Sequence, residues 1–359
     1  MARALVRSLV AGHEETDRIE LLTAAGSDAL GGLGVGIGTQ DRIRVTQAVR
    51  HEGPRHFAWD LPVWLRRLTP RPDLVLCLTH APLGNPVPVA LMVPDLSFEH
   101  LPDAFPRLTR LRLQTLVRRQ TSKVDRVLTI SEFCRADLIA TYGLDPLRVH
   151  HVPLHVDLPG ASHDVGDMRR RLGVAGPFVL YLGNLHPRKN LPIAIAAFHR
   201  AVADHAELRH HGFVVAGAPW WGSRDHRTDI DLTAVRFPGR VSDDDRDALL
   251  SAADVLVYPS RFEGFGLPPL EAFARGTPVV ASNVTAIPEI CGDAALMVDP
   301  DDEVAMAKAI VAAVNDKVVR RSLIEAGYRR AAHYNDGLTT AALWEALRAT
   351  TRPAMATTA

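Results

Sequence analysis

Short apolar runs alternate with helical patterns through the second half of the chain, and this alternation limits the possible folds more than any other feature. Runs such as "PFVLYLGN" (177–184) and "DVLVYPS" (254–260) are continuously apolar and bounded by turn residues, which is typical of parallel strands buried on both faces. Helical patterns over 191–205, 243–252 and 267–275 separate such runs. Strands and helices that alternate at this spacing build βαβ units, so we predict an α/β fold with a parallel sheet between two layers of helices.

Apolar runs and helical patterns also alternate in the first half of the chain. Apolar runs at 72–80, 88–95 and 124–131 predict buried strands, and the last is followed by a helical pattern that ends at Gly143, a typical C-cap residue. A chain of 359 residues is too long for one compact core, so two domains are expected. Both would be doubly wound parallel sheets. Such sheets bind ligands beyond the carboxyl ends of their strands, so both domains can face one cleft.

Composition places the domain boundary in the segment "LPGASHDVGD", which is rich in Gly, Ser, Pro and Asp. We predict a first domain over 1–157, a linker over 158–170 and a second domain over 171–335. The remaining residues, 336–359, are expected to form a C-terminal helix and tail that cross back to the first domain.

Charge and cysteine content exclude several classes. The formal net charge of +0 gives no whole-molecule attraction to nucleic acid, so no nucleic-acid partner is expected. Cys77, Cys134 and Cys291 are odd in number and lack CxxC spacing, which is typical of a reduced chain without disulfides or thiolate metal sites. No run approaches the roughly 20 apolar residues of a membrane span, and "MARALVRSLVAGHEE" lacks the pattern of a signal peptide. These features predict a soluble, cytoplasmic protein.

The stretch "RFEGFGLPPLEAFARGTPVV" (261–280) carries two carboxylates around a glycine-rich loop. It follows a predicted strand and precedes a predicted helix, so the loop lies at the carboxyl edge of the sheet. Gly264 and Gly266 let backbone N–H groups approach a ligand closely, and the helix N-terminus favours an anion such as phosphate. Glu263 would repel a phosphate, so it should contact uncharged sugar hydroxyls beside one. Glu271, on the first turn of the helix, can accept hydrogen bonds from a vicinal diol such as a ribose.

Each of these residues also has a purely structural explanation. Glu271 alone would be an ordinary N-terminal helix charge, and Glu263 alone a carboxylate in a turn. The segment "YLGNLHPRKNL" (181–191) places Arg188 and Lys189 between a strand and a helix. Adjacent basic residues usually form a solvated turn, but at this edge of the sheet they can neutralise a diphosphate. The combination is more specific than any one part.

These two segments, with the continuous stretch from "FPGRV" to "MVDPDD" (237–302), resemble the GT-B retaining glycosyltransferases of family GT4. The resemblance is strong over 177–335 and weaker over 72–157. Within the family, the chain most resembles bacterial mannosyltransferase-like enzymes that act on surface glycans. Glu263 and Glu271 match the E-x7-E signature of the family. The resemblance implies two Rossmann-like, doubly wound domains that face a cleft.

The resemblance also implies a site for a nucleotide-diphospho-sugar in the C-terminal domain. Arg188 and Lys189 would hold the diphosphate, together with the backbone N–H groups of 264–267. Glu271 would bind the ribose and Glu263 the donor sugar. The backbone of 240–241 would contact the base. The implied catalytic residues are Glu263, Lys189, Arg188 and His80. The implied donor-binding residues are Gly183, Asn184, Arg240, Val241, Gly264, Phe265, Gly266, Leu267 and Glu271.

Two positions depart from the family pattern. Many relatives have an arginine directly after the glycine of the phosphate strand, whereas this chain has Asn184. Arg188 and Lys189 must therefore supply more of the positive charge that faces the diphosphate. Relatives often have His-Asp after a late strand of the first domain, and here the pair is Pro94-Asp95. His80 resembles the other cleft histidine of the family, although a lone histidine at a strand end is more often structural.

The N-terminus departs further. GT-B chains normally open with a strand, a glycine-rich loop and a helix, whereas "ARALVRSLVAG" resembles that helix, so the first strand and loop are expected to be missing. The segment "ALGGLGVGIGT" (29–39) lacks GxGxxG spacing, and we interpret it as a loop. Either the start of the chain is assigned too late or the first sheet lacks its usual central strand. If the first explanation holds, a chain extended upstream should be more stable and more active.

Two further motifs have competing explanations. "SDDDRD" (242–247) contains the aspartates of an Asp-x-Asp metal motif, but they also fit the first turn of a helix after Ser242. GT-B enzymes generally need no metal, so neither a metal nor a cofactor is expected. "PRLTRLRLQTLVRRQTSK" (106–123) interleaves arginines with leucines and holds no acid. A solvated helix face is the ordinary explanation, and contact with anionic lipid at the inner face of the membrane is the alternative.

The predicted function is transfer of a sugar, with retention, from a nucleotide-diphospho-sugar to a hydroxyl of a glycan or glycolipid acceptor in surface polysaccharide synthesis. The resemblance favours mannose and GDP-mannose as the donor. The leaving phosphate would help to deprotonate the acceptor, and cations at the phosphate would stabilise its charge. A GT-B epimerase, a phosphorylase and a non-catalytic nucleotide-sugar-binding protein are the alternatives.

Overall fold

The computed structural model describes residues 1–14, 17–23, 43–47, 61–82, 84, 86–158, 164–219 and 231–351. The chain divides into two compact units. The N-terminal unit comprises Met1–Leu96, Leu113–His155 and Asp336–Ala359, and the C-terminal unit comprises Ser97–Arg112 and Val156–Asn335. Each unit has its own parallel sheet, in agreement with the predicted α/β class.

The C-terminal unit is built on a six-stranded parallel sheet with the order β12-β11-β10-β7-β8-β9. Its strands are β7 (Phe178–Leu182), β8 (Gly212–Ala216), β9 (Val235–Gly239), β10 (Val255–Tyr258), β11 (Val279–Ser282) and β12 (Ala295–Val298). This is the arrangement of the doubly wound dinucleotide-binding fold, in which the strand order reverses in the middle of the sheet. The reversal lies between β7 and β10, so the loops after these two strands meet at the topological switch point.

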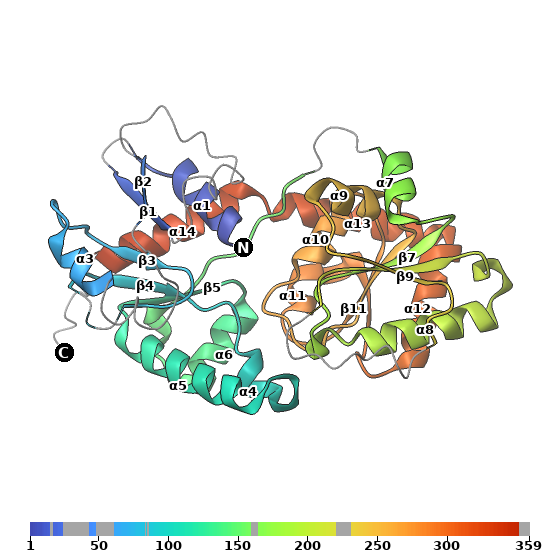
Figure 1. Ribbon diagram of the computed structural model, residues 1–359, viewed down its shortest axis with the longest axis horizontal. Coiled ribbons are helices and arrows are strands. Elements are labelled where there is room, and N and C mark those ends of the chain that lie inside the picture. The colour runs from blue at the N-terminus through green and yellow to red at the C-terminus, as the bar shows by residue number, and fades with distance from the viewer. Residues whose placement is uncertain are drawn as a thin grey trace. The chain divides into compact units, whose positions relative to one another are not determined.

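Helices cover both faces of this sheet (Figure 1). They are α7 (Val165–Leu172), α8 (Leu191–Asp204), α9 (Asp243–Ala252), α10 (Leu267–Phe273), α11 (Ile287–Cys291), α12 (Glu303–Asn315) and α13 (Lys317–His333). α8 and α12 pack together on one face, where Phe198, Phe213 and Ile310 belong to one buried core cluster. α10 and α13 pack against each other on the other face. Every residue of β7 and β10 is buried, which explains why both strands have continuously apolar sequences.

The N-terminal unit contains a four-stranded parallel sheet with the order β3-β4-β5-β6 and a separate parallel pair, β1-β2. The strands are β1 (Ile19–Thr23), β2 (Ile43–Gln47), β3 (Val75–Cys77), β4 (Val89–Met92), β5 (Arg126–Thr129) and β6 (Val149–His151). Among the described residues of this half of the chain, the α-helices are α1 (Ala2–Ala11), α3 (Leu61–Arg67), α4 (Ser97–His100), α5 (Arg107–Lys123) and α6 (Glu132–Tyr142). α4 belongs to the C-terminal unit, and α5 has residues in both units. The glycine-rich segment 29–39 lies outside the described residues.

The last helix, α14 (Asp336–Thr351), packs within the N-terminal unit against α1, β4 and β5. The Ser8 hydroxyl donates a hydrogen bond of 2.7 Å to Asp336 Oδ1 at the start of the helix. Gly12 approaches Trp344 so closely that a Cβ at this glycine would lie 2.3 Å from Cδ1 of the indole. Leu343 is fully buried. The end of the chain therefore completes the core of the unit in which the chain begins.

Two boundaries differ from the sequence prediction. α7 begins at Val165, within the range 158–170 that was assigned to the linker, because the Asp164 side chain caps this helix by accepting a backbone N–H. Residues 97–112 group with the C-terminal unit, although the sequence placed all of 1–157 in one domain. Over the described residues, none of the helices has both the length and the apolar character needed to cross a membrane.

Candidate active site

Two loops meet at the switch point of the C-terminal sheet. The first follows β7 and includes Gly183 and a 3-10 turn over Pro187–Lys189, and the second follows β10 and includes Arg261 and Glu263. The backbone N–H of Arg261 donates to the carbonyl of Arg188 over 2.8 Å, so the two loops are joined through their backbones. The predicted cations and the first glutamate of the E-x7-E pattern therefore lie together.

Glu263 is paired with both of these cations. Its Oε1 lies 2.5 Å from Lys189 Nζ, and its Oε2 lies 3.0 Å from Arg188 Nη1. Glu263 and Lys189 are only 6% and 8% exposed, so little solvent screens the charges. The Lys189 ammonium also donates to the hydroxyl of the buried Tyr258 over 2.9 Å. Two cations against one carboxylate leave a net positive charge in a buried place, which suits a polyanion such as a diphosphate.

The pKa of Glu263 reflects this environment. Burial alone would raise the pKa of the carboxyl, but the charges of Lys189 and Arg188, with a hydrogen bond from Lys189, lower it to about 2. Burial, together with the charge of Glu263, raises the pKa of Tyr258 well above 10. At neutral pH the cluster therefore consists of an ionised glutamate, two cations and a neutral phenol, and the carboxylate can accept hydrogen bonds from sugar hydroxyls.

Packing anchors the glycine-rich loop over 264–267. The ring of Phe265 is buried and meets Tyr334 edge to face, with ring centroids 5.5 Å apart. Gly266 has a φ of 130°, and a Cβ there would lie 3.1 Å from Cδ1 of Ile287, so a side chain would be strained at this position. The predicted donor contact of Phe265 would therefore use its backbone, because its ring belongs to the core.

Glu271 lies further along α10 than predicted. The helix begins at Leu267, so Glu271 is its fifth residue, and the first turn holds no acid. The expectation that Glu271 occupies the first turn is wrong because a turn of helix ends after 3.6 residues. Its side chain is half-buried, and its Oε1 lies 3.7 Å from Arg246 Nη1 on α9. Burial raises the pKa of Glu271, although the charges of Arg246 and Arg275 act to lower it.

A network of charges joins α9 and α10 around Glu271. Arg275 Nη2 lies 2.6 Å from Asp247 Oδ2, and Arg275 Nη1 donates to the Glu271 carbonyl over 2.9 Å. Arg246 forms ion pairs of 3.2 Å with both Asp243 and Asp247. The two arginines therefore hold the backbone of Glu271 and face its side chain. The sequence analysis did not identify this network, because its members come from α9, α10 and the turn after α10, none of which has an unusual charge pattern.

The other predicted donor-binding residues follow strands at the same edge of the sheet. Gly183 and Asn184 come directly after β7, and a Cβ at Gly217 would lie 1.8 Å from the carbonyl oxygen of Gly183, so only a glycine allows this approach. Arg240 and Val241 come directly after β9, which is separated from β7 by β8. Arg240 is exposed and Val241 is half-buried. Their contacts with a donor stay predictions.

His80 belongs to the N-terminal unit. It follows β3, and its side chain is half-buried. The cluster around Glu263 belongs to the C-terminal unit, so the role of His80 near the leaving phosphate also stays a prediction.

Comparison with known proteins identifies the family. The family described as "Glycosyl transferases group 1" matches residues 176–316, and the family described as "Glycosyltransferase Family 4" matches residues 2–159. The chain belongs to the GT4-like glycosyltransferases. The O-antigen chain mannosyltransferase B of Escherichia coli is 28% identical over 249 residues, which are 67% of this chain and 65% of that protein.

A D-inositol 3-phosphate glycosyltransferase of Geodermatophilus obscurus is 35% identical over 229 residues, which are 58% of this chain and 49% of that protein. The chain thus matches between 49% and 65% of the length of these two relatives. HepE of Anabaena, solved in complex with UDP and glucose, has a TM-score of 0.71 at 18% identity over 97% of this chain and 95% of that chain. At this identity the likeness shows the fold alone, and it confirms the predicted GT-B fold of two Rossmann-like domains.

Sequence reasoning about this GT4-like chain missed several residues that shape the cluster. Tyr258 is the last residue of β10, and its hydroxyl accepts a hydrogen bond from the Lys189 ammonium. Thr285 accepts the backbone N–H of Glu263 at its Oγ1 over 3.1 Å. Asn190 has a φ of 54° and donates from Nδ2 to the carbonyl of Pro300 over 2.7 Å. A tyrosine at the end of an otherwise aliphatic strand was the one available signal.

The aspartates of "SDDDRD" begin a helix. Ser242 caps α9 by accepting the backbone N–H of Asp245 over 3.1 Å, and Asp243–Asp245 fill the first turn. This supports the structural explanation of the motif. Among the described ranges, His, Cys, Asp and Glu side chains do not gather in a group of three or more that could hold a metal ion. The expected independence from metal stays a prediction.

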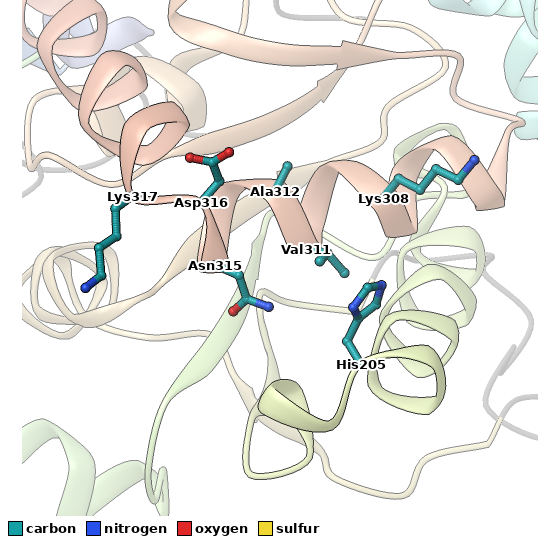
Figure 2. Close-up of a pocket in the computed structure, with 7 residues that line it drawn as sticks. All are labelled: His205, Lys308, Val311, Ala312, Asn315, Asp316 and Lys317. Atoms are coloured by element: carbon teal, nitrogen blue, oxygen red, sulfur yellow. The ribbon is translucent and has the colours of Figure 1, made fainter.

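A surface pocket of about 600 Å³ lies elsewhere on the C-terminal unit (Figure 2). It is lined by His205, Lys308, Val311, Ala312, Asn315, Asp316 and Lys317. These residues come from α12, from the residue directly after α8, and from the junction between α12 and α13. Because these helices run back along the sheet, their C-terminal ends lie at the amino edge of the strands, whereas ligands of this fold bind at the carboxyl edge. The predicted donor-binding residues do not line this pocket.

Proposed function

We propose that the protein transfers a glycosyl group from a nucleotide-diphospho-sugar to a hydroxyl of a glycan or lipid-linked acceptor, with retention at the anomeric carbon. The observation that carries the proposal is the buried cluster of Glu263, Lys189 and Arg188 at the switch point of the C-terminal sheet. A net positive, poorly solvated site beside a carboxylate suits a ligand that joins a diphosphate to a polyol.

Each part of such a donor has a matching group in the C-terminal unit. The ammonium of Lys189 and the guanidinium of Arg188 would hold the diphosphate, with the backbone N–H groups of Gly266 and Leu267 nearby. Glu263 would accept hydrogen bonds from the hydroxyls of the sugar. Glu271, which is contacted by Arg246 of α9 and by Arg275 just after α10, would accept the ribose diol.

The chemistry that these residues supply is electrostatic. Negative charge grows on the diphosphate as the glycosidic bond breaks. Lys189, held by the Tyr258 hydroxyl, and Arg188, held by the Phe262 carbonyl, would stabilise this charge without rearranging. An oxygen of the leaving phosphate would take the proton of the acceptor hydroxyl on the same face of the sugar. Such a front-face route gives retention without a covalent glycosyl-enzyme. His80 is proposed to contact the donor sugar and the leaving phosphate.

Mannose is the sugar that we favour, with GDP-mannose as the donor, because mannosyltransferases are among the relatives. HepE was solved with UDP and glucose, so a UDP-sugar is the second candidate. The O-antigen relatives support an acceptor that belongs to a surface polysaccharide. The reaction is proposed to need no metal ion or cofactor.

We also propose a contact between α5 and anionic lipid, which would bring the enzyme to a lipid-linked acceptor. Between Asp103 and Asp125 the chain holds no acidic residue, so α5 is flanked by acids but carries only basic charge. Leu108 and Leu111 are 82% and 46% exposed near its start. Its exposed basic residues are Arg107, Arg112, Arg118, Arg119 and Lys123. Exposed leucines beside basic residues are typical of helices that lie at a membrane surface.

A donor panel tests the proposed function. The protein is incubated with GDP-mannose, UDP-glucose and other nucleotide sugars, with and without oligosaccharide or glycolipid acceptors, and released nucleoside diphosphate is measured. Transfer to an acceptor with an unchanged anomeric configuration, read by NMR of the product, is the expected result. Conversion of one nucleotide sugar into another without acceptor would indicate an epimerase, a requirement for inorganic phosphate would indicate a phosphorylase, and binding without turnover would indicate a binding protein.

A further inference from the structure

Glu263 forms ion pairs with both of the cations that would bind the diphosphate of a donor. One carboxylate oxygen contacts Lys189 at 2.5 Å and the other contacts Arg188 at 3.0 Å, so the carboxylate bridges the pair as two phosphate oxygens would. Arg188 is further engaged by the carbonyl of Phe262, to which its Nη1 donates over 2.5 Å. A diphosphate at these cations must therefore compete with an internal anion.

The backbone of Glu263 is held by hydrogen bonds that do not involve its carboxylate. The backbone N–H donates to Thr285 Oγ1 over 3.1 Å, and the carbonyl accepts from the Ala286 N–H over 3.4 Å. Both neighbouring rings, Phe262 and Phe265, are buried. Movement of the carboxylate from the cations to a sugar would therefore leave the backbone in place and involve only rotation of the glutamate side chain.

We propose that Glu263 acts as an internal counter-anion that promotes release of the nucleoside diphosphate after transfer. This rests on the proposed function. While a donor is bound, hydroxyls of its sugar hold the carboxylate away from the cations. Transfer breaks the bond between the anomeric carbon and the phosphate oxygen and moves the sugar to the acceptor, so those hydroxyls leave. The carboxylate then returns to Lys189 and Arg188 and displaces the diphosphate.

This mechanism also selects between donor and product. Both ligands carry a diphosphate, but only the donor brings hydroxyls that keep Glu263 engaged elsewhere. The ionised state of the carboxylate at neutral pH means that its competition operates at the pH of the reaction. A site that held the diphosphate with uncompensated cations would instead bind the product more tightly and turn over slowly.

The test compares the binding of products to wild type, Glu263→Gln and Glu263→Asp. Dissociation constants for UDP, GDP, ADP and inorganic pyrophosphate are measured by calorimetry, together with product inhibition. Glu263→Gln should bind the diphosphates at least about tenfold more tightly, which corresponds to about 1.4 kcal/mol. The affinity for pyrophosphate, which lacks a ribose, should rise to the same extent, because Glu263 and the diphosphate compete only for Lys189 and Arg188.

Glu271→Gln is the matched control, since it removes the charge of the other glutamate of the pattern. This variant should bind the nucleoside diphosphates more weakly than wild type and bind pyrophosphate with the same affinity. If Glu263→Gln does not fold, Glu263→Asp carries the test: its shorter side chain cannot bridge both cations, and it should bind diphosphates more tightly than wild type. Equal or weaker binding in whichever variant folds overturns the inference. Failure of the wild type to bind any nucleoside diphosphate would contradict the proposed function instead.

Discussion

Lys189 Nζ lies 2.5 Å from Glu263 Oε1, and the lysine and the glutamate are less than a tenth exposed. The pair joins the loop after β7 to the loop after β10, the two central strands at which the strand order reverses. A buried ion pair of this kind adds little net stability, because both ions lose their hydration, but breaking it by removing one partner is costly. Its position therefore has more to do with the ligand than with folding.

Replacing Lys189 by methionine should reduce kcat/KM for transfer by about 10²- to 10³-fold. The reason is that one of the two cations facing the leaving diphosphate is lost, and the removal of a single group that stabilises developing charge has effects of this size. Steady-state kinetics with the identified donor measures the change. The matched control is Arg200→Ala, which removes an exposed cation paired with Glu303 at 2.7 Å. That variant should retain activity within about twofold, because exposed ion pairs contribute only about 0–1 kcal/mol. Full activity of the methionine variant would reject the assignment of Lys189.

Replacing Glu271 by glutamine should raise the KM for the donor by about tenfold and change kcat little. A hydrogen bond from a hydroxyl to a charged acceptor contributes about 1.5–3 kcal/mol. Burial raises the pKa of Glu271, so the carboxylate is lost earlier on acidification than an exposed one would be. In the wild type, KM should therefore rise as the pH falls toward that pKa. Kinetics between neutral and acidic pH should show this rise in wild type and not in the glutamine variant.

A donor analogue with a deoxyribose provides the control for this assignment. If Glu271 binds the ribose diol, the analogue should be a poor substrate of wild type and should lose little more in Glu271→Gln. If the losses of activity caused by the analogue and by Glu271→Gln add together, the Glu271 carboxylate does not bind the ribose diol.

Acid should unfold the C-terminal unit partly through Glu263. Its pKa is about 2 in the folded chain and about 4.5 when unfolded, so the unfolded state binds more protons on acidification. The stability that this carboxylate contributes is fully present above about pH 4.5 and is lost as the pH falls toward 2. At about 1.4 kcal/mol per pKa unit the contribution is about 3 kcal/mol. Urea unfolding at neutral pH and at several acidic pH values measures it.

Glu263→Gln should be less stable than wild type at neutral pH and should have a shallower dependence of its free energy of unfolding on pH in this window. Glu325→Gln changes an exposed carboxylate of α13 and should follow the wild type. Parallel pH profiles for wild type and Glu263→Gln would mean that the cluster does not lower the pKa of the glutamate.

The α5 surface should bind vesicles that contain anionic lipid. Each Lys or Arg near such a surface contributes about 1 kcal/mol, so reversing Arg112 and Arg119 to glutamate should reduce flotation strongly, and binding should weaken with salt. Arg321→Glu with Arg329→Glu, which reverses two exposed arginines of α13, changes the net charge equally and should not affect flotation. Failure of the wild type to float at low salt would refute the lipid contact.

Transfer should continue in the presence of excess EDTA. Lys189 and Arg188 already supply the positive charge that a divalent cation supplies to diphosphates in other enzymes, and the aspartates over 243–245 begin α9. Activity is compared before and after chelation, and Asp244→Asn should behave as wild type. Loss of activity that returns with Mg²⁺ or Mn²⁺ would show that a metal is needed.

Much of the C-terminal unit was predictable, because the relevant signals are local. β7 and β10 are buried on both faces, so their sequences are apolar throughout, and the loops that follow them carry glycine and charge. The turn before α8 and the glycine-rich loop before α10 could therefore be assigned to one edge of a parallel sheet. The predicted start of α10 was also correct, although Glu271 was assigned to the first turn and lies just after it.

The tertiary structure decided what depends on distant residues. Lys189 and Tyr258 are 69 residues apart in the chain, and no local pattern predicts that a tyrosine hydroxyl and a glutamate would share one ammonium. The grouping of α14 with α1 depends on packing between the first and last described helices. The placement of 97–112 in the C-terminal unit depends on contacts with residues beyond 155.

The sequence by itself determined the central strands β7 and β10, the helices α8 and α10 and the two loops at the sheet edge, because apolar periodicity and turn composition act over a few residues. Only the tertiary structure decided that Glu263 pairs with both cations of its site and that Arg246 faces Glu271. Those charges meet because the strand order reverses between β7 and β10 and because α9 packs beside α10, and both arrangements depend on contacts between segments far apart in the chain.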